Sequence, residues 1–253
     1  MIPWLRPDDA PDAFPPVETA LREPDGLLCA GGDLSPARLV EAYRRGIFPW
    51  FSAGQPILWW SPDPRTVLEP GRLRVSRSLA KSLRNRGYSV TSDRAFGAVV
   101  EHCADPALRP EGTWITTAMR AAYLQLHRLG WAHSVETWRD GRLVGGLYGV
   151  AIGRAFFGES MFSVERDASK VALCALARAL RERDDCLDDC LIDCQIASGH
   201  LASLGAHSLP RREFVERLRT VTAGGLAPDK LWTEASIALP GAFVQNPRGS
   251  RGC

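Results

Sequence analysis

The segment of residues 46–68, GIFPWFSAGQPILWWSPDPRTVL, constrains the fold more than any other stretch of this chain. Its prolines at positions 49, 56, 62 and 64 exclude a long helix or a central strand. Burial of Trp50, Trp59 and Trp60 would remove much apolar area from water, so we expect this loop to dock on the protein body. A corner of the core is one interpretation of these aromatics, and a crevice that stacks a nucleobase or an apolar side chain is the other.

Length and composition indicate a cytosolic globular protein. A chain of 253 residues can form one large or two small domains, and 45% hydrophobic with 24% charged residues is typical of the soluble class. We find no apolar stretch that could span a bilayer, and residues 1–7, MIPWLRP, lack the layout of a signal peptide. The odd number of cysteines, seven, favours reduced thiols.

Three cysteines spaced four apart, Cys186, Cys190 and Cys194, invite a metal-site interpretation. A strand predicted over residues 191–195 would separate the third thiol from the other two, and the sequence has no CxxC pair. We therefore predict buried or incidental thiols and no metal.

The periodicity and the capping signals predict an α+β protein. Gly31 and Gly32 predict a tight turn, after which Asp33 or Ser35 caps a helix that ends at Gly46. Ser76 caps a second helix that ends at Gly87, and Thr116 or Thr117 caps a third that ends near Gly130. Further helices are predicted at about 96–103, 169–180 and 211–221, and strands at 65–68, 73–75, 88–91, 132–139, 143–152, 155–161 and 191–195. We predict a small N-terminal α/β domain, residues 1–87, and a second domain, residues 88–253.

A block of basic residues marks the second predicted helix. The net charge of +2 gives no general attraction to nucleic acid, but residues 72–86 contain six basic residues and no acidic one. Arg77, Lys81 and Arg84 share one helix face, opposite Leu79 and Leu83. An ordinary surface helix mixes both signs, so this face favours phosphate contact over the alternative of a solvated surface.

Polar residues interrupt two apolar strands. Asp193 and Gln195, two apart, should share one face of their strand, and Glu159 lies within the apolar run 156–162. Such groups must be hydrogen-bonded in the core or line a cleft, and the pattern alone favours neither.

Seven ordered motifs resemble the leucyl/phenylalanyl-tRNA–protein transferase family over roughly residues 12–235. They are LLCAGGDL (27–34), AYRRGIFPWF (42–51), LWWSPDPR (58–65), EGTWIT (111–116), GESMFS (158–163), LIDCQ (191–195) and ASLGA (202–206). The resemblance implies transfer of Leu or Phe, less readily Met, from aminoacyl-tRNA to the α-amine of proteins that begin with Arg or Lys. It implies a role in N-degron proteolysis, no ATP, metal or other cofactor, and a second domain similar to the N-acetyltransferase-like acyltransferase fold.

The resemblance also implies roles for individual residues. Asp193 would draw the proton from the attacking amine. Gln195 would orient that amine and hydrogen-bond the reacting centre, and Glu159 would meet the cationic end of the acceptor. The donor side chain would enter an apolar pocket formed by Leu147, Phe156, Leu173, Leu176 and Ile192. The aminoacyl-adenosine end would meet Trp50, Trp114 and Tyr123. The tRNA would contact Arg77, Lys81, Arg84 and Arg86, although Ala80 and Asn85 stand where relatives have basic residues, and Ser198 replaces an expected asparagine.

Two other functions are compatible with parts of this pattern. A coenzyme A-dependent acyltransferase would need a glycine-rich turn before a helix, but the matching residues 163–170, SVERDASK, contain no glycine. A non-catalytic RNA-binding module would leave Glu159, Asp193 and Gln195 unexplained. The sequence does not rank Leu against Phe or set the oligomeric state, for which a monomer is the simplest assumption.

Overall fold

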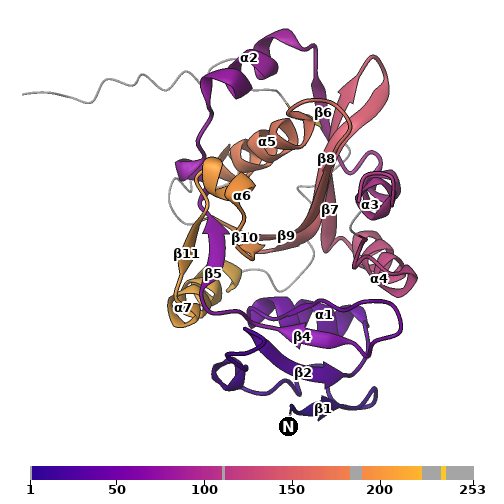
Figure 1. The fold of residues 1–253 in the computed structure, drawn as a ribbon, viewed down its shortest axis with the longest axis vertical. Coiled ribbons are helices and arrows are strands. Elements are labelled where there is room, and N and C mark those ends of the chain that lie inside the picture. Colours follow the sequence, from indigo (N-terminus) through magenta and orange to yellow (C-terminus); the bar gives the residue numbers. More distant parts are fainter. Residues whose placement is uncertain (1, 110–111, 183–189, 224–234, 238–253) are drawn as a thin grey trace, which may run out of the picture.

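The computed structural model describes residues 2–109, 112–182, 190–223 and 235–237 (Figure 1). Across these ranges the strands form two mixed sheets, which confirms the α+β prediction. In the smaller sheet β1 (Trp4–Leu5), β2 (Leu27–Gly31), β4 (Leu58–Trp60) and β3 (Phe48–Pro49) lie in that order. Helix α1 (Pro36–Arg44) and the 3-10 turn η1 (Val17–Thr19) belong to the same part of the chain. None of the helices in these ranges has the length and apolar character needed to cross a membrane.

The larger sheet holds eight strands within the described ranges. Their order is β11 (His207–Leu209), β5 (Arg65–Leu68), β10 (Leu191–Gln195), β9 (Ala155–Ser163), β8 (Arg142–Ile152), β7 (Ala132–Arg139), β6 (Ser89–Ser92) and β12 (Ala235–Ile237). Strands β9 and β10 pair in parallel, whereas the other neighbours in this sheet are antiparallel.

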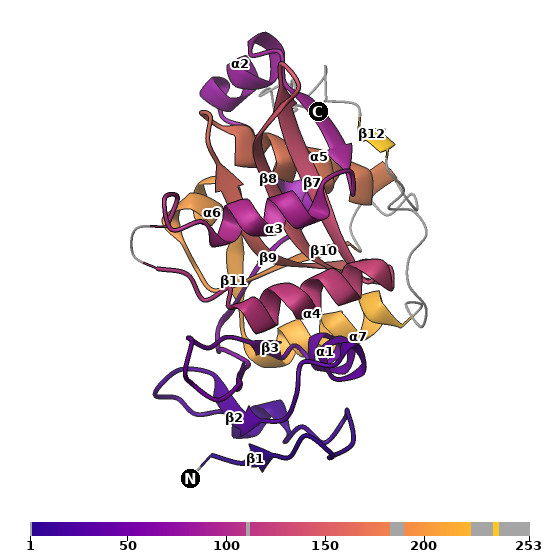
Figure 2. The ribbon, with the colours of Figure 1, turned by 90° about the vertical axis from the view of Figure 1, so that its right-hand side faces the viewer.

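Helices cover both faces of the larger sheet (Figures 1 and 2). Helix α5 (Ala168–Glu182) packs on one face, against β7 and β8, while α3 (Phe96–Ala104) and α4 (Thr117–Arg128) pack on the other. Helix α5 approaches closely, because a Cβ atom placed on Gly145 would lie 2.5 Å from the Cβ atom of Ala168. The remaining helices are α2 (Arg77–Asn85), α6 (Gly199–Ser203) and α7 (Arg211–Thr222).

Local signals predicted most helix boundaries correctly. The side chains of Ser35, Ser76 and Thr116 accept backbone N–H groups at the starts of α1, α2 and α4. The predicted strand at 73–75 is wrong. Pro70–Arg72 forms the 3-10 turn η2, and the next segment is held by the Arg74 N–H, which donates to the Leu204 carbonyl at 2.8 Å.

The aromatic segment docks as expected. Trp59 is fully buried, packs edge-on against Phe14 with ring centroids 4.9 Å apart, and donates its indole N–H to the Gly31 carbonyl at 2.9 Å. Trp50, in contrast, is 40% exposed and contacts the half-buried Trp60. The segment is therefore partly core and partly an accessible aromatic surface.

Strand β5 lies inside the predicted N-terminal domain, yet it pairs with β10 and β11 in the larger sheet. Helix α2, which ends near the predicted boundary at residue 87, packs on α5. Through these pairings and this packing, residues 65–87 lie with the larger sheet, in which every residue of β5 is buried. The division into two domains stays a prediction.

Candidate active site

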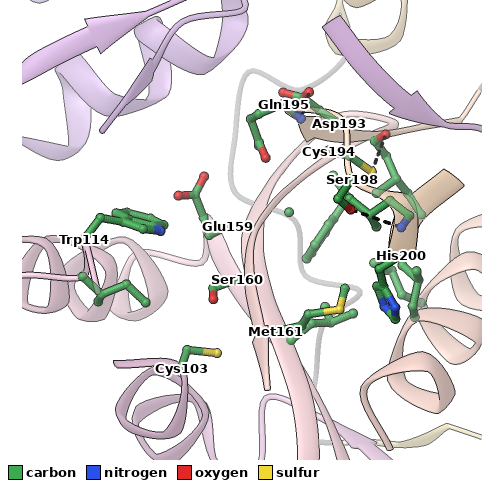
Figure 3. Close-up of a pocket in the computed structure, with 18 of the residues that line it drawn as sticks. Cys103, Trp114, Glu159, Ser160, Met161, Asp193, Cys194, Gln195, Ser198 and His200 are labelled. Carbon is green, nitrogen blue, oxygen red and sulfur yellow. Dashed lines mark hydrogen bonds between the residues drawn. The ribbon is translucent and has the colours of Figure 1, made fainter. Parts of the chain in front are cut away.

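A cavity of about 350 Å³ opens where β10 diverges from β9 (Figure 3). The parallel ladder runs only from Leu191 opposite Ala155 to Asp193 opposite Phe157, whereas β9 continues to Ser163. Residues after these last pairs, together with α5, α6 and the segment at Trp114, line the opening. The end of a strand pair thereby brings polar residues of β9 and β10 to one space.

The five apolar residues predicted for the donor pocket all line this cavity. They come from β8, β9, α5 and β10, and each is almost fully buried: Leu147, Phe156, Leu173, Leu176 and Ile192. Met161 and Leu201 also line it and were not predicted. Such an interior accepts an apolar side chain and excludes water.

Asp193 is fully buried in an ion pair with Arg65. The Arg65 Nε and Nη2 atoms donate to its two carboxylate oxygens at 2.8 and 2.7 Å. The guanidinium also donates to the Gly46 carbonyl at 3.0 Å and lies over the rings of Phe48 and Phe214. Both oxygens of Asp193 are therefore engaged by the protein, and Arg65 is a site residue that the sequence analysis missed.

Gln195 departs from regular strand geometry. The register shifts between Asp193 and Gln195, and Gln195 has a φ of 56°, so the simple alternation expected for these two residues is interrupted. Its backbone N–H donates to Asp193 Oδ1 at 3.0 Å, which ties the bulge to the ion pair. The side-chain amide nitrogen is buried and has no hydrogen-bond partner among the described residues. A buried donor left in this way is costly unless a ligand oxygen accepts from it.

Glu159, on β9, shares the cavity with Gln195. Its side chain is half-buried, and the hydroxyl groups of Tyr43 and Tyr123 donate to its two carboxylate oxygens at 2.6 and 2.5 Å. Burial raises the pKa of Glu159 to about 7; the two hydrogen bonds oppose that rise, and the negative charge of Asp193 adds to it.

The aromatic residues divide between the cavity and the core. Trp50 and Trp114 flank an adjoining cavity of about 190 Å³ that Glu159 and Gln195 also line. Both also border an outer groove with Trp60, which the sequence analysis had not assigned to the site. Tyr123, predicted at the adenosine end, is fully buried behind Glu159, so its ring offers no stacking surface.

Ser198 lines the cavity at the start of α6. Its hydroxyl accepts the N–H of Leu201 at 3.2 Å, so this side chain caps the helix as well as facing the cavity. His200, two residues further along, lines the same wall and was not predicted; burial lowers its pKa.

The predicted basic face forms on α2. Leu79 and Leu83 are buried, while Arg77, Lys81 and Arg84 are exposed and pair with no acidic side chain of the described residues. Arg86, just after the helix, is half-buried. Of the three cysteines considered for a metal, Cys186 lies outside the described residues, so that grouping is not tested here.

Comparisons with known proteins agree with the resemblance in both parts of the chain. Residues 67–219 match the family described as leucyl/phenylalanyl-tRNA protein transferase, and residues 32–63 match its N-terminal domain. The leucyl/phenylalanyl-tRNA–protein transferase of Azoarcus sp. (strain BH72) is 60% identical over 242 residues, covering 94% of this chain and 98% of the relative. The protein of the same name from Aromatoleum aromaticum is 58% identical over 245 residues, covering 96% and 100%.

Similarity to solved structures is much weaker. L-PGS from Bacillus licheniformis aligns with 63% of this chain and 50% of its own, at a TM-score of 0.35 and 11% identity. Agreement at that level supports no inference about fold or function.

Proposed function

This chain belongs to the leucyl/phenylalanyl-tRNA–protein transferase family, and we propose that it moves Leu or Phe, and less readily Met, from aminoacyl-tRNA to a protein N-terminus. The acceptor is the α-amine of a protein that begins with Arg or Lys, and the product is a substrate for N-degron proteolysis. The enzyme is an aminoacyltransferase that we place in the cytosol, as a monomer with no added cofactor.

One observation carries this proposal: a single cavity has an apolar interior and a polar opening. The interior suits the side chain of Leu or Phe, and Gln195 and Glu159 stand where the ester and the acceptor amine would meet. An apolar pocket separates side chains that differ by a methylene by only about 1–3 kcal/mol, so donor preference should be graded.

The reaction needs little chemical assistance because an aminoacyl ester is already activated. The amine nitrogen attacks the ester carbonyl carbon, the bond to the ribose oxygen breaks, and a proton from the nitrogen ends on that oxygen. Alignment of amine and ester could supply up to about 7–11 kcal/mol of the barrier lowering. We assign the unpartnered amide of Gln195 to the oxygen that gains negative charge.

Asp193 acts in this proposal through Gln195. Both Asp193 oxygens already accept hydrogen bonds from Arg65 and from the Gln195 backbone, which argues against direct contact with the amine. The attacking amine gives its proton to Gln195 or to a water held there, and the group that receives the proton gains positive charge. The nearby negative charge of Asp193 stabilises that positive charge. Glu159 meets the cationic end of the acceptor.

The tRNA approaches over two surfaces in this proposal. Trp50 and Trp114 hold the terminal adenosine by stacking, and the basic face of α2 contacts phosphates of the acceptor stem. We also propose that the sheet after β5 forms an acyltransferase domain of the N-acetyltransferase type, supported by the parallel β9–β10 pair that opens onto the cavity.

The test is a transfer assay with radiolabelled Leu-tRNA and two peptides, one beginning with Arg and one with Ala, without ATP or added metal. We expect label only on the Arg peptide. Gln195→Ala should lose most of kcat and keep tRNA affinity, whereas Gln125→Ala, an exposed glutamine on α4, should behave as wild type. Binding of tRNA without any transfer would favour an RNA-binding module, and dependence on coenzyme A would favour another acyltransferase.

A further inference from the structure

Behind the cavity, three side-chain groups form a closed triangle of short oxygen contacts. The hydroxyl of Tyr43 lies 2.6 Å from Glu159 Oε1, and that of Tyr123 lies 2.5 Å from Glu159 Oε2. The two hydroxyl oxygens lie 2.6 Å from each other. Since the residues come from α1, α4 and β9, three separate elements converge on this carboxyl group.

Each of these three contacts has the length of a hydrogen bond, so each needs a proton. Two tyrosines supply two protons, because each hydroxyl carries one hydrogen. With Glu159 ionised, both are used on the carboxylate, and the Tyr43–Tyr123 contact is left as two oxygens without a hydrogen between them. A protonated Glu159 supplies the third hydrogen and completes a ring of three hydrogen bonds.

The tyrosines keep their own protons, since burial and the nearby carboxylate raise their pKa values well above the ordinary range. The titratable and charged groups that face Glu159 are Tyr43 from α1, Tyr123 from α4, Tyr148 from β8, Asp193 and Cys194 from β10, and Arg65 from β5. Cys103, Arg109 and His200 line the cavity wall farther along. Arg65, whose charge acts to lower the pKa of Glu159, is engaged by Asp193, and within the described residues no cation forms an ion pair with Glu159.

We propose that Tyr43 and Tyr123 are positioning residues for acceptor binding, which hold Glu159 as a shared-proton ring until a cationic amino terminus displaces the proton. This inference rests on the proposed function, in which Glu159 meets the acceptor. Both tyrosines are fully buried and cannot touch substrate themselves. They act only by setting the protonation and the direction of the Glu159 carboxyl group.

The proposal predicts how acceptor binding depends on pH. Two hydrogen bonds hold the ionised form of Glu159, but the closed ring of the protonated form has three, so the ring as a whole favours the proton. Removal of one tyrosine hydroxyl leaves one hydrogen bond in either form and should lower the pKa of Glu159, by about one unit. If that pKa moves from about 7 to about 6, the ionised fraction at pH 6 rises from about one eleventh to about one half. The acceptor KM should then fall about fivefold at pH 6 and hardly change at pH 9, with kcat nearly unchanged.

The structure provides a matched control in Tyr148. It is as fully buried as the other two, and its ring packs edge-on against Tyr123 at 5.4 Å. Its hydroxyl, however, has no hydrogen-bond partner in the described part of the chain. Tyr148→Phe therefore removes the same atom from the same cluster without removing a hydrogen bond.

The experiment follows the carboxyl carbon of Glu159 by NMR in protein labelled with ¹³C-glutamate, and the signal is assigned by its absence in Glu159→Gln. In the wild type we expect titration near pH 7, with downward shifts in Tyr43→Phe and in Tyr123→Phe and no shift in Tyr148→Phe. The acceptor KM of the same variants, measured from pH 6 to pH 9, should follow these shifts.

Either of two results would overturn the inference. One is titration of wild-type Glu159 near its ordinary pKa of about 4.3, a measurement that needs no variant to fold. The other is equal titration in all three tyrosine variants. A failure of the proposed function would be visible separately, as absence of transfer by the wild type, because the NMR titration does not depend on activity.

Discussion

Asp193→Ala should cost stability as well as activity. The substitution leaves Arg65 buried between two aromatic rings with a single hydrogen bond, to the Gly46 carbonyl. Removal of one partner from a buried ion pair typically costs about 3–5 kcal/mol, because the remaining charge is neither solvated nor neutralised. Typical domains unfold with only about 5–15 kcal/mol, so this variant would lose a large share of its free energy of unfolding.

Urea unfolding followed by circular dichroism measures this cost. Arg65→Met and Asp193→Ala should each be strongly destabilised, and the double variant should lose less than the sum of the two, because it buries no lone charge. Glu216→Ala serves as the control, since it removes the acidic partner of an exposed i,i+4 pair with Arg212. That change should cost well under about 1 kcal/mol.

A loss in Asp193→Ala as small as that in Glu216→Ala would refute this reasoning. It would mean that Arg65 finds solvent or another acceptor when its partner is removed. With the expected result, the kcat of Asp193→Ala is interpretable only after correction for the folded fraction. Asp193→Asn is then the better test of chemistry, because it keeps the shape and part of the hydrogen bonding to Arg65.

Three further outcomes are expected. Lys81→Glu should weaken tRNA binding, and the slope of log K against log salt concentration should become shallower by about one or more. Arg212 of α7 is 89% exposed, and Arg212→Glu should change neither the affinity nor that slope. Leu176→Ala should enlarge the donor pocket and raise the rate of Phe transfer relative to Leu transfer. Leu180 is buried on the same helix but lies outside the pocket, so Leu180→Ala serves as the control. It should cost about 2–5 kcal/mol of stability and leave the ratio of Phe to Leu transfer unchanged. The pKa of Glu159 is raised from 4.5 to about 7, so protonated Glu159 stabilises the fold fully below pH 4.5, and this contribution is lost as the pH rises through 7. In urea unfolding, the wild type should therefore lose about 3 kcal/mol relative to Glu159→Gln between pH 4 and pH 8.

The features that local sequence determines were predictable. Ser35, Ser76 and Thr116 each precede a helix and cap it with their own side chain, so a few adjacent residues contain the whole signal. The apolar pocket was assigned from the family resemblance and not from periodicity. The structure brings all five of its predicted residues to one cavity.

Long-range pairing was not predictable in the same way. Arg65 meets Asp193 across 128 positions, and β5 had been placed in the first domain, so nothing local connected the two residues. A signal nevertheless existed. A carboxylate inside an apolar strand requires a cationic or a hydrogen-bonding partner, and Arg65 opens another short strand whose four residues are all buried. Matching buried charges of opposite sign between predicted strands could have suggested the pair.

Tyr43 and Tyr123 show where a pattern of apolar residues is insufficient. Tyr43 fits the apolar stripe of its helix and Tyr123 was assigned to stacking, yet the chemistry of both resides in the hydroxyl group. A phenylalanine would fill either ring site, so a buried tyrosine indicates that its oxygen has a partner. The sequence cannot identify that partner, because it is chosen where α1, α4 and β9 meet. Tyr148 makes the same point in reverse, since its hydroxyl is equally buried and has no partner in the described part of the chain. Burial, and after it the charge of the same Glu159 carboxyl group, raises the pKa of Tyr148. The three tyrosines thus differ in what their oxygens contact and not in how deeply they are buried, which is why substitution of each by Phe separates positioning of Glu159 from packing around it.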